Sequence, residues 1–166
     1  MVLLVGFVCG LLLIGYVDQQ RREIRAADGS SVMVRDGDSL AFNDTEFRIF
    51  GIDAPELRQT CQDSNGKAWR CGEAAKSALR RLVMQGELRC LPQARDRFGR
   101  QVATCQVKGV EDLGEAMVRQ GLAVALEART SAYAAAEALA RREKRGLWQG
   151  TFSPPADWRN QHPRDD

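Results

Sequence analysis

Residues 35–56 read RDGDSLAFNDTEFRIFGIDAPE, and this segment is predicted to form two short strands joined by a turn. The pair Asn43-Asp44 has turn composition and is flanked by apolar residues, so the turn is placed there. A tight hairpin would bring Asp38 and Asp53 toward each other across the sheet. Two close carboxylates repel each other unless a positive charge lies between them, and a hard cation such as Ca²⁺ takes oxygen ligands. The segment therefore predicts a cation site.

Two further charged side chains of the same segment complete the predicted site. Arg48 belongs to the returning strand and could lie over the same place as the aspartates. Pro55 cannot donate a hydrogen bond to a neighbouring strand and restricts Ala54, so the chain should leave the sheet there and carry Glu56 to the side of the cation. Any one of these acids alone would most simply be a solvated turn residue. The combination favours a functional site.

Composition limits the chemistry that the chain can use. The 166 residues allow one domain with appendages, and a content of 44% hydrophobic and 28% charged residues is ordinary for a globular protein. A net charge of +2 excludes a polybasic coat as the main signal for partners, so affinity for nucleic acid must come from a local cluster. His162 is the only histidine and lies in a polar tail, which disfavours a Ser-His-Asp triad, a histidine base and a histidine-built zinc site.

The amino terminus begins with an uninterrupted apolar run, residues 1–17. As a helix this run would be about 25 Å long, close to the lower limit for crossing the hydrocarbon core of about 30 Å. A transmembrane anchor is the first expectation. A signal segment is the second, because the run lacks a basic n-region and a clear cleavage site. A buried core helix is the weakest alternative, since the run has no polar face. Residues 18–30 are polar and are predicted to be a linker.

Four cysteines downstream of this run predict two disulfide bonds. Cys90 and Cys105 flank a turn sequence symmetrically and would lie opposite each other in a hairpin, whereas Cys61 and Cys71 close a short loop. Disulfide bonds imply an oxidising compartment, so the domain is expected outside the cytoplasm, anchored to a membrane or secreted after cleavage. The arginines that follow the apolar run argue the other way, because basic flanks usually stay inside. Four buried thiols are the alternative to two disulfides.

Apolar periodicity and turn residues predict the other elements. The predicted elements are a strand at 31–35, a polar loop at 57–66, a helix at 67–85, a hairpin at 87–107, a short helix at 112–120, an apolar segment at 122–126, a last helix at 131–145 and a non-helical tail at 151–166. This order favours an α+β fold over residues 31–150, a five-stranded OB-type barrel with three helices. A hydrophobic N-terminal helix would precede it.

The turn of the predicted hairpin is basic, with Arg95, Arg97 and Arg100 around Phe98. Alone, such a turn is usually a solvated basic loop. Beside an acidic cation site it becomes a candidate phosphate clamp, because the planar guanidinium pairs with two phosphate oxygens at once.

Five short motifs carry a resemblance to a known family. They are Asp36-Gly37-Asp38-Ser39, Phe47-Arg48, Asp53-Ala54-Pro55-Glu56, Asp96-Arg97-Phe98-Gly99-Arg100 and Val118-Arg119-Gln120-Gly121-Leu122-Ala123. Their order and approximate spacing resemble those of the staphylococcal nuclease (thermonuclease) family. The resemblance covers roughly residues 31–148, and the motifs are specific as a set rather than singly.

The resemblance implies an OB-fold phosphodiesterase that depends on Ca²⁺ and acts on DNA and RNA, leaving 3′-phosphate ends. It implies that Asp38, Asp53 and the backbone carbonyl of Ala54 bind the metal. It also implies that Glu56 is the acid near the attacking water, and that Arg48 and Arg100 bind phosphate. Phe98 departs from the pattern, because the reference enzyme has a phosphate-binding tyrosine there. The competing interpretation is a catalytically inactive OB-fold module that binds single-stranded nucleic acid or a protein partner. We expect a monomer in either case.

Overall fold

The computed structural model describes residues 24–126 and 133–163 of the chain. The strands are β1 (Ile24–Ala26), β2 (Met33–Val34), β3 (Ser39–Phe42), β4 (Thr45–Ile49), β5 (Ile52–Asp53), β6 (Cys61–Gln62), β7 (Ala68–Trp69), β8 (Leu88–Arg95), β9 (Gln101–Gln106) and β10 (Val124–Ala125). The helices are α2 (Cys71–Val83), α3 (Leu113–Arg119), α4 (Ala134–Arg142) and α5 (Pro155–Gln161), with 3-10 turns η1 (Gly29–Ser31) and η3 (Gly146–Gln149).

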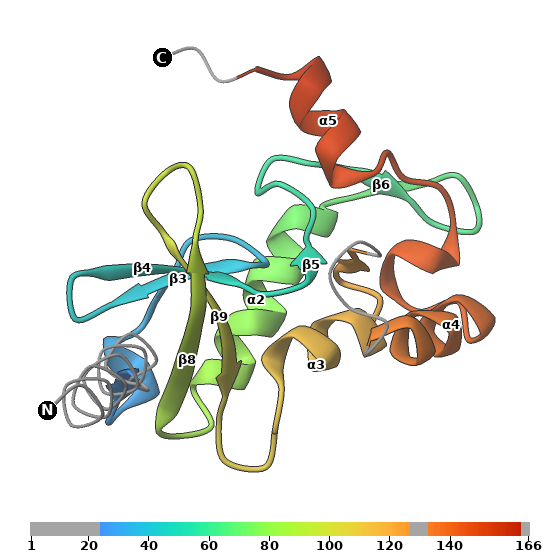
Figure 1. The fold of residues 1–166 in the computed structure, drawn as a ribbon. Coiled ribbons are helices and arrows are strands. Elements are labelled where there is room, and N and C mark those ends of the chain that lie inside the picture. Colours follow the sequence, from blue (N-terminus) through green and yellow to red (C-terminus); the bar gives the residue numbers. More distant parts are fainter. Residues whose placement is uncertain (1–23, 127–132, 164–166) are drawn as a thin grey trace, which may run out of the picture.

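Six strands form the main sheet in the order β1-β8-β9-β4-β3-β2, and the helices lie to one side of it (Figure 1). Two small sheets, β5 with β10 and β6 with β7, connect the main sheet to the helical side. The arrangement is a mixed α+β fold with a curled half-barrel sheet, consistent with the predicted OB-type architecture.

The predicted hairpin is present as β3 and β4. Its turn residues Asn43 and Asp44 have φ angles of 48° and 57°, the left-handed pair that a two-residue hairpin turn requires. The register pairs Ser39 with Arg48, so Arg48 lies beside the end of β3 that follows Asp38. On its other edge β4 pairs in parallel with β9, where Arg48 is the partner of Val102. The parallel pair brings the β8–β9 hairpin next to the acidic segment.

The core lies between the sheet and helices α2 and α3. Leu40, Phe47 and Ile49 of the sheet, Leu79 of α2 and Met117 of α3 are almost wholly removed from water. Helix α2 therefore turns one face toward the core. Asp112 caps α3, since its side chain accepts hydrogen bonds from the backbone N–H groups at positions 114 and 115.

Both predicted disulfide bonds are present. Cys61 is bonded to Cys71 and Cys90 to Cys105. Cys90 and Cys105 are direct partners in the β8–β9 register, as the symmetric turn sequence predicted. The Cys61–Cys71 bond ties β6 to the first residue of α2.

The fold differs from the prediction in strand number and helix number. The main sheet has six strands rather than five because β1, within the predicted linker, pairs with β8. The described residues hold four α-helices rather than three, because α5 forms in the tail predicted to be non-helical. Pro155 is the first residue of α5, where its missing N–H costs no hydrogen bond and its fixed φ suits a helix.

The predicted anchor or signal segment, residues 1–17, lies outside the described residues. Within residues 24–126 and 133–163, none of the helices has the length and apolar character needed to span a bilayer.

Candidate active site

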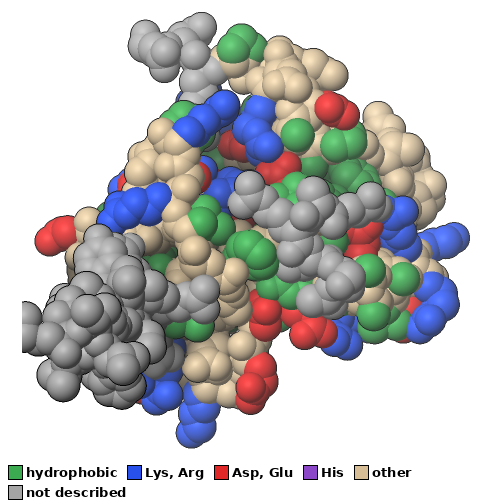
Figure 2. Space-filling view, viewed as in Figure 1, with side chains coloured by type: hydrophobic (Ala, Val, Ile, Leu, Met, Phe, Trp, Pro, Cys, Tyr) green, Lys and Arg blue, Asp and Glu red, His purple; other side chains and the backbone are tan. Residues whose placement is uncertain are grey.

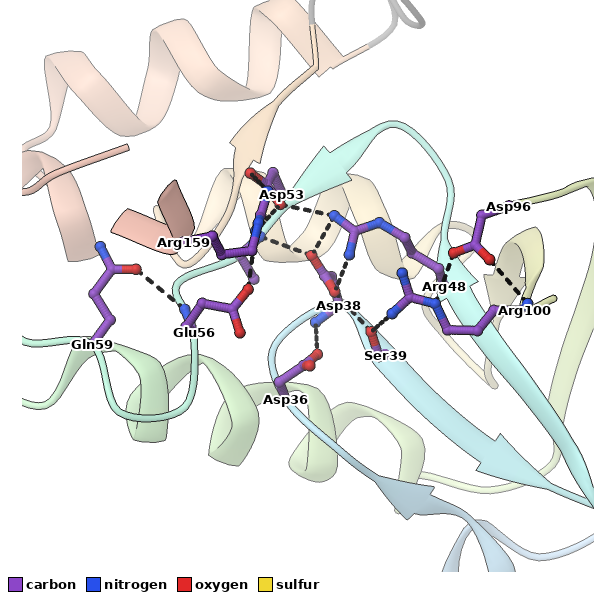
Figure 3. A network of polar contacts seen from close by, with 11 residues as sticks. Asp36, Asp38, Ser39, Arg48, Asp53, Glu56, Gln59, Asp96, Arg100 and Arg159 are labelled. Carbon is purple, nitrogen blue, oxygen red and sulfur yellow. Dashed lines mark hydrogen bonds and ion pairs between the residues drawn. The ribbon is translucent and has the colours of Figure 1, made fainter. Parts of the chain in front are cut away.

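The predicted site residues come together at one end of the sheet (Figure 3). Asp38 lies directly before β3, Arg48 is in β4, Asp53 ends β5, and Glu56 follows in the loop after it. Arg100 approaches from the turn between β8 and β9. Figure 2 shows acidic and basic side chains close together on the face between this turn and α5, so the charges reach the surface.

Arg48 joins the two aspartates. Its Nη1 donates to Asp38 Oδ1 at 3.1 Å, and its Nη2 lies 3.0 Å from Asp38 Oδ2 and 2.8 Å from Asp53 Oδ1. A single guanidinium nitrogen is thus within hydrogen-bond distance of both carboxylates. Burial works against the charge of Arg48, but the two carboxylates outweigh it and raise the pKa of Arg48. The structure brings Asp38 and Asp53 together on Arg48, whose guanidinium supplies the positive charge between them.

Asp38 is the most constrained acid of the site. Its side chain accepts hydrogen bonds from Ser39 Oγ at 2.9 Å and from the Ala54 backbone N–H at 3.0 Å. Burial raises the pKa of Asp38 to about 7, because a carboxylate charge is costly to remove from water, while Arg48 opposes the shift. Gly37 lets this segment approach the rest of the site: a Cβ there would lie 2.6 Å from the Cβ of Ala54.

Arg100 is the one arginine of the basic turn whose contacts lead toward the acids. Its Nη1 donates to Ser39 Oγ at 3.2 Å, and its Nε donates to Asp96 Oδ2 at 2.7 Å. Arg95 instead donates to the Gly99 carbonyl, and the Arg97 guanidinium lies 4.8 Å above the exposed ring of Phe98. The predicted phosphate clamp therefore reduces to Arg100, with Asp96 fixing the direction of its side chain.

Glu56 belongs to a loop that is packed tightly against α2. A Cβ at Gly72 would lie 1.8 Å from the Glu56 carbonyl oxygen, so only glycine fits at this point of the helix. The backbone N–H of Glu56 donates to Gln59 Oε1 at 3.2 Å, and Gln59 Nε2 donates to the Ser153 carbonyl at 2.7 Å. The fully buried Gln59 therefore links the loop that carries Glu56 to the C-terminal segment. Sequence reasoning missed Gln59, because it placed the residue in a polar surface loop.

Arg159 of α5 is the second residue that sequence reasoning missed. It donates to both carboxylate oxygens of Asp53 and to Glu56 Oε1, each at 3.0 Å. Burial works against the charge of Arg159, but hydrogen bonds from its guanidinium to Asp53 and Glu56 raise its pKa. The proline at the start of α5 could have indicated a helix, but nothing in the sequence indicates which acids its arginine would meet.

The donor set of this site suits a hard divalent cation. Asp38 and Asp53 present carboxylate oxygens within reach of one nitrogen of Arg48, and a backbone carbonyl at Ala54 would add a third oxygen. Such a site has two acidic side chains, and within the described ranges no group of three or more His, Cys, Asp or Glu side chains is arranged to hold a metal. Cysteines 61, 71, 90 and 105 are in disulfides, and His162 stacks on Trp158, so soft ligands are absent from this part of the chain.

The fold and the site define a curled OB-like domain with paired carboxylates and arginines at one end of its sheet. Residues 46–150 match the family described as "Staphylococcal nuclease homologue", and the chain belongs to this family. The matched range includes Arg48, Asp53, Glu56 and Arg100 and ends before α5.

Several curated relatives are similar to this chain. The succinoglycan biosynthesis protein ExoI of Rhizobium meliloti is 32% identical, with the match covering 70% of this chain and 62% of the relative. Probable endonuclease LCL3 of Arthroderma otae is 33% identical over 76% of this chain and 47% of the relative. Probable endonuclease LCL3 of Paracoccidioides brasiliensis is 31% identical over 68% of this chain and 38% of the relative. The chain thus spans between about two fifths and three fifths of the length of these relatives.

Proposed function

We propose that the chain is a metal-dependent nuclease that hydrolyses phosphodiester bonds of DNA and RNA, with Ca²⁺ as the working ion. The observation that carries the proposal is the convergence of Asp38, Asp53 and Glu56 with Arg48 and Arg100 in one cluster. Membership of the staphylococcal nuclease family and the relatives named probable endonucleases support it. The proposed products are a 3′-phosphate and a 5′-hydroxyl.

The proposed roles of the acids are those that the family resemblance implies, and the positions of the acids in the cluster support them. Asp38, Asp53 and the carbonyl of Ala54 would hold the cation, whose charge polarises a phosphodiester oxygen when it is bound. Glu56 accepts a proton from the attacking water, or at least orients that water, while the water oxygen bonds to phosphorus. The bond from phosphorus to the 5′ oxygen breaks, and that oxygen leaves as a hydroxyl after taking up a proton.

The two predicted arginines stabilise the charge that builds on the phosphate oxygens. Arg48 already spans both aspartates, and Arg100 is directed by Asp96 toward Ser39, beside Asp38. Arg100 is therefore held in place before substrate arrives, which is what electrostatic stabilisation of a transition state requires, whereas Arg48 shares its two aspartates with the proposed cation.

The test is degradation of plasmid DNA, single-stranded DNA and RNA by the purified full chain with Ca²⁺, Mg²⁺ or EDTA. We expect cleavage with Ca²⁺, none with EDTA, and 3′ ends that a polymerase extends only after phosphatase treatment. Glu56→Gln should lose most of this activity. Glu46→Gln is the matched control, because Glu46 is an exposed residue of β4 that pairs with Arg35. Cleavage that persists in EDTA, or that is equal in both variants, would contradict the proposal.

A further inference from the structure

The C-terminal segment after residue 150 is attached to the site loop although it lies beyond the family match. Thr151 and Gln62 form a backbone bridge, with hydrogen bonds of 2.8 and 3.2 Å. Gln59 holds the Ser153 carbonyl, and Pro155 at the start of α5 is buried. The loop that makes these contacts is itself fixed to α2 by the Cys61–Cys71 bond. The C-terminal segment is therefore packed and hydrogen-bonded into the fold at this end of the molecule.

The attached segment places a third guanidinium, that of Arg159, beside Asp53 and Glu56. Arg159 Nη1 and Nη2 pair with the two oxygens of Asp53 in the fork geometry typical of arginine and carboxylate, and Nη1 also reaches Glu56. The Asp53 side chain is only 4% exposed, whereas that of Arg159 is 37% exposed. Arg159 is thus the more exposed partner of the pair, and Figure 3 shows it beside Asp53 and Glu56.

The position of Arg159 sets it in competition with a divalent cation. It occupies both oxygens of Asp53, which the proposed nuclease needs for its metal, and one oxygen of Glu56, which it needs for water. A cation that binds Asp53 repels the guanidinium and weakens its hold on the carboxylates. The anchors of the segment lie at residues 151–155, so the Arg159 side chain, a turn of helix further on, can move without breaking them.

A displaced Arg159 would still lie beside the place where a phosphate binds. Resting on the proposed nuclease function, we propose that Arg159 is a third phosphate-binding arginine of the site. It lies on Asp53 and Glu56 until a divalent cation takes Asp53, and it then pairs with a phosphate of the nucleic acid. The substrate contact is thereby made only when the cation is in place.

The experiment compares the full-length wild type with Arg159→Gln and Arg142→Gln. Arg142 is the matched control, because it is an exposed arginine of α4 paired only loosely with its neighbour Glu143. Calorimetric titration with Ca²⁺ alone should show that Arg159→Gln binds the ion roughly three- to tenfold more tightly than wild type, because a competing charge has been removed. Arg142→Gln should bind like wild type.

Fluorescence anisotropy with a cleavage-resistant phosphorothioate oligonucleotide supplies the second measurement. Arg159→Gln should weaken binding of the oligonucleotide about fivefold or more in Ca²⁺ and should change it little in EDTA, since Arg159 then stays on the carboxylates. Arg159→Lys keeps the charge but not the fork, so it should recover part of the Ca²⁺-dependent binding. Arg159→Met, which also lacks the charge, takes the place of the glutamine variant if that variant does not fold, as judged by its thermal unfolding.

Two results would overturn the inference. An unchanged Ca²⁺ affinity in Arg159→Gln would show that the arginine does not compete with the ion. Tighter Ca²⁺ binding with unchanged affinity for the oligonucleotide would show a competitor that makes no phosphate contact. If wild type binds both probes but cleaves no nucleic acid, the proposed nuclease function fails, while the two binding measurements still decide the role of Arg159. If wild type binds neither probe, both proposals fail.

Discussion

The three arginines of the β8–β9 turn differ in what their guanidiniums contact. Arg100 is joined to Asp96 and Ser39, whereas Arg95 contacts only a turn carbonyl and Arg97 lies over the exposed Phe98 ring. The spacing of the basic residues in the sequence could not show which of the three arginines contacts the acidic cluster. The difference comes from the parallel pairing of β4 with β9, which directs one side of the turn toward the acids.

Replacing Arg100 by Gln should lower kcat by about 10²–10³, by analogy with the loss of one donor to a charged transition state. The effect should fall on kcat more than on KM, because the charge on phosphate grows during the reaction. Arg97→Gln, in the same turn, should leave kcat close to wild type. Steady-state cleavage of a fluorogenic oligonucleotide measures both variants, and equal rates for the two would contradict the role assigned to Arg100.

Most of the site could be predicted because its residues are close in sequence. Asp38, Arg48, Asp53 and Glu56 lie in one hairpin and the loop after it, so strand alternation and a turn are enough to bring them together. Gln59 and Arg159 could not be predicted, because their partners lie 94 to 106 positions away. No local sequence pattern predicts a contact between residues so far apart in the chain. Such a contact exists only once the whole chain has packed.

At the level of elements, the loop after β5 and the segment before α5 depend on each other. The side chain of Gln59 bonds both, and it is completely buried. The short elements at the ends, β1 and α5, escaped prediction for a related reason. Each is stabilised by a partner distant in sequence, which is β8 for β1 and Gln59 for the segment of α5. Neither is specified by an apolar periodicity of its own.

Replacing Gln59 by Leu keeps the volume of the side chain but leaves the Glu56 N–H and the Ser153 carbonyl without this partner. The free energy of unfolding should fall by about 1–3 kcal/mol, the cost of buried polar groups that lose a hydrogen bond. Gln85→Leu, at an exposed position after α2, should change it by less than about 0.5 kcal/mol. Urea unfolding measures both variants. A neutral Gln59→Leu would mean that the two loops are held together by other contacts.

Across the whole molecule, the two disulfide bonds hold different parts. Cys90–Cys105 joins neighbouring strands within the main sheet, whereas Cys61–Cys71 fixes the loop that carries Gln59 and Gln62. The sequence indicated both pairings, because one follows from a symmetric hairpin and the other from a short loop. It could not indicate that the second bond supports the C-terminal helix.

Replacing either pair of bonded cysteines by alanine should lower the free energy of unfolding by roughly 2–4 kcal/mol, which is the usual effect of removing a cross-link from the unfolded chain. Cys61→Ala/Cys71→Ala should also speed amide hydrogen exchange in α5, and Cys90→Ala/Cys105→Ala should not. Exchange measured by mass spectrometry distinguishes the two. Thiol labelling of all four cysteines in the denatured, unreduced protein would contradict the pairings.

The parallel contact between β4 and β9 also determines the order in which the cluster can form during folding. The acidic hairpin that carries Arg48 closes locally. Arg100 joins the cluster only when a long loop closes and β9 pairs with β4, and the entropy cost of closing this loop comes before the contacts that compensate for it. A partly folded chain therefore presents acids without the second arginine and without α5. For the proposed nuclease activity, this would delay its onset until the last long-range contacts have formed.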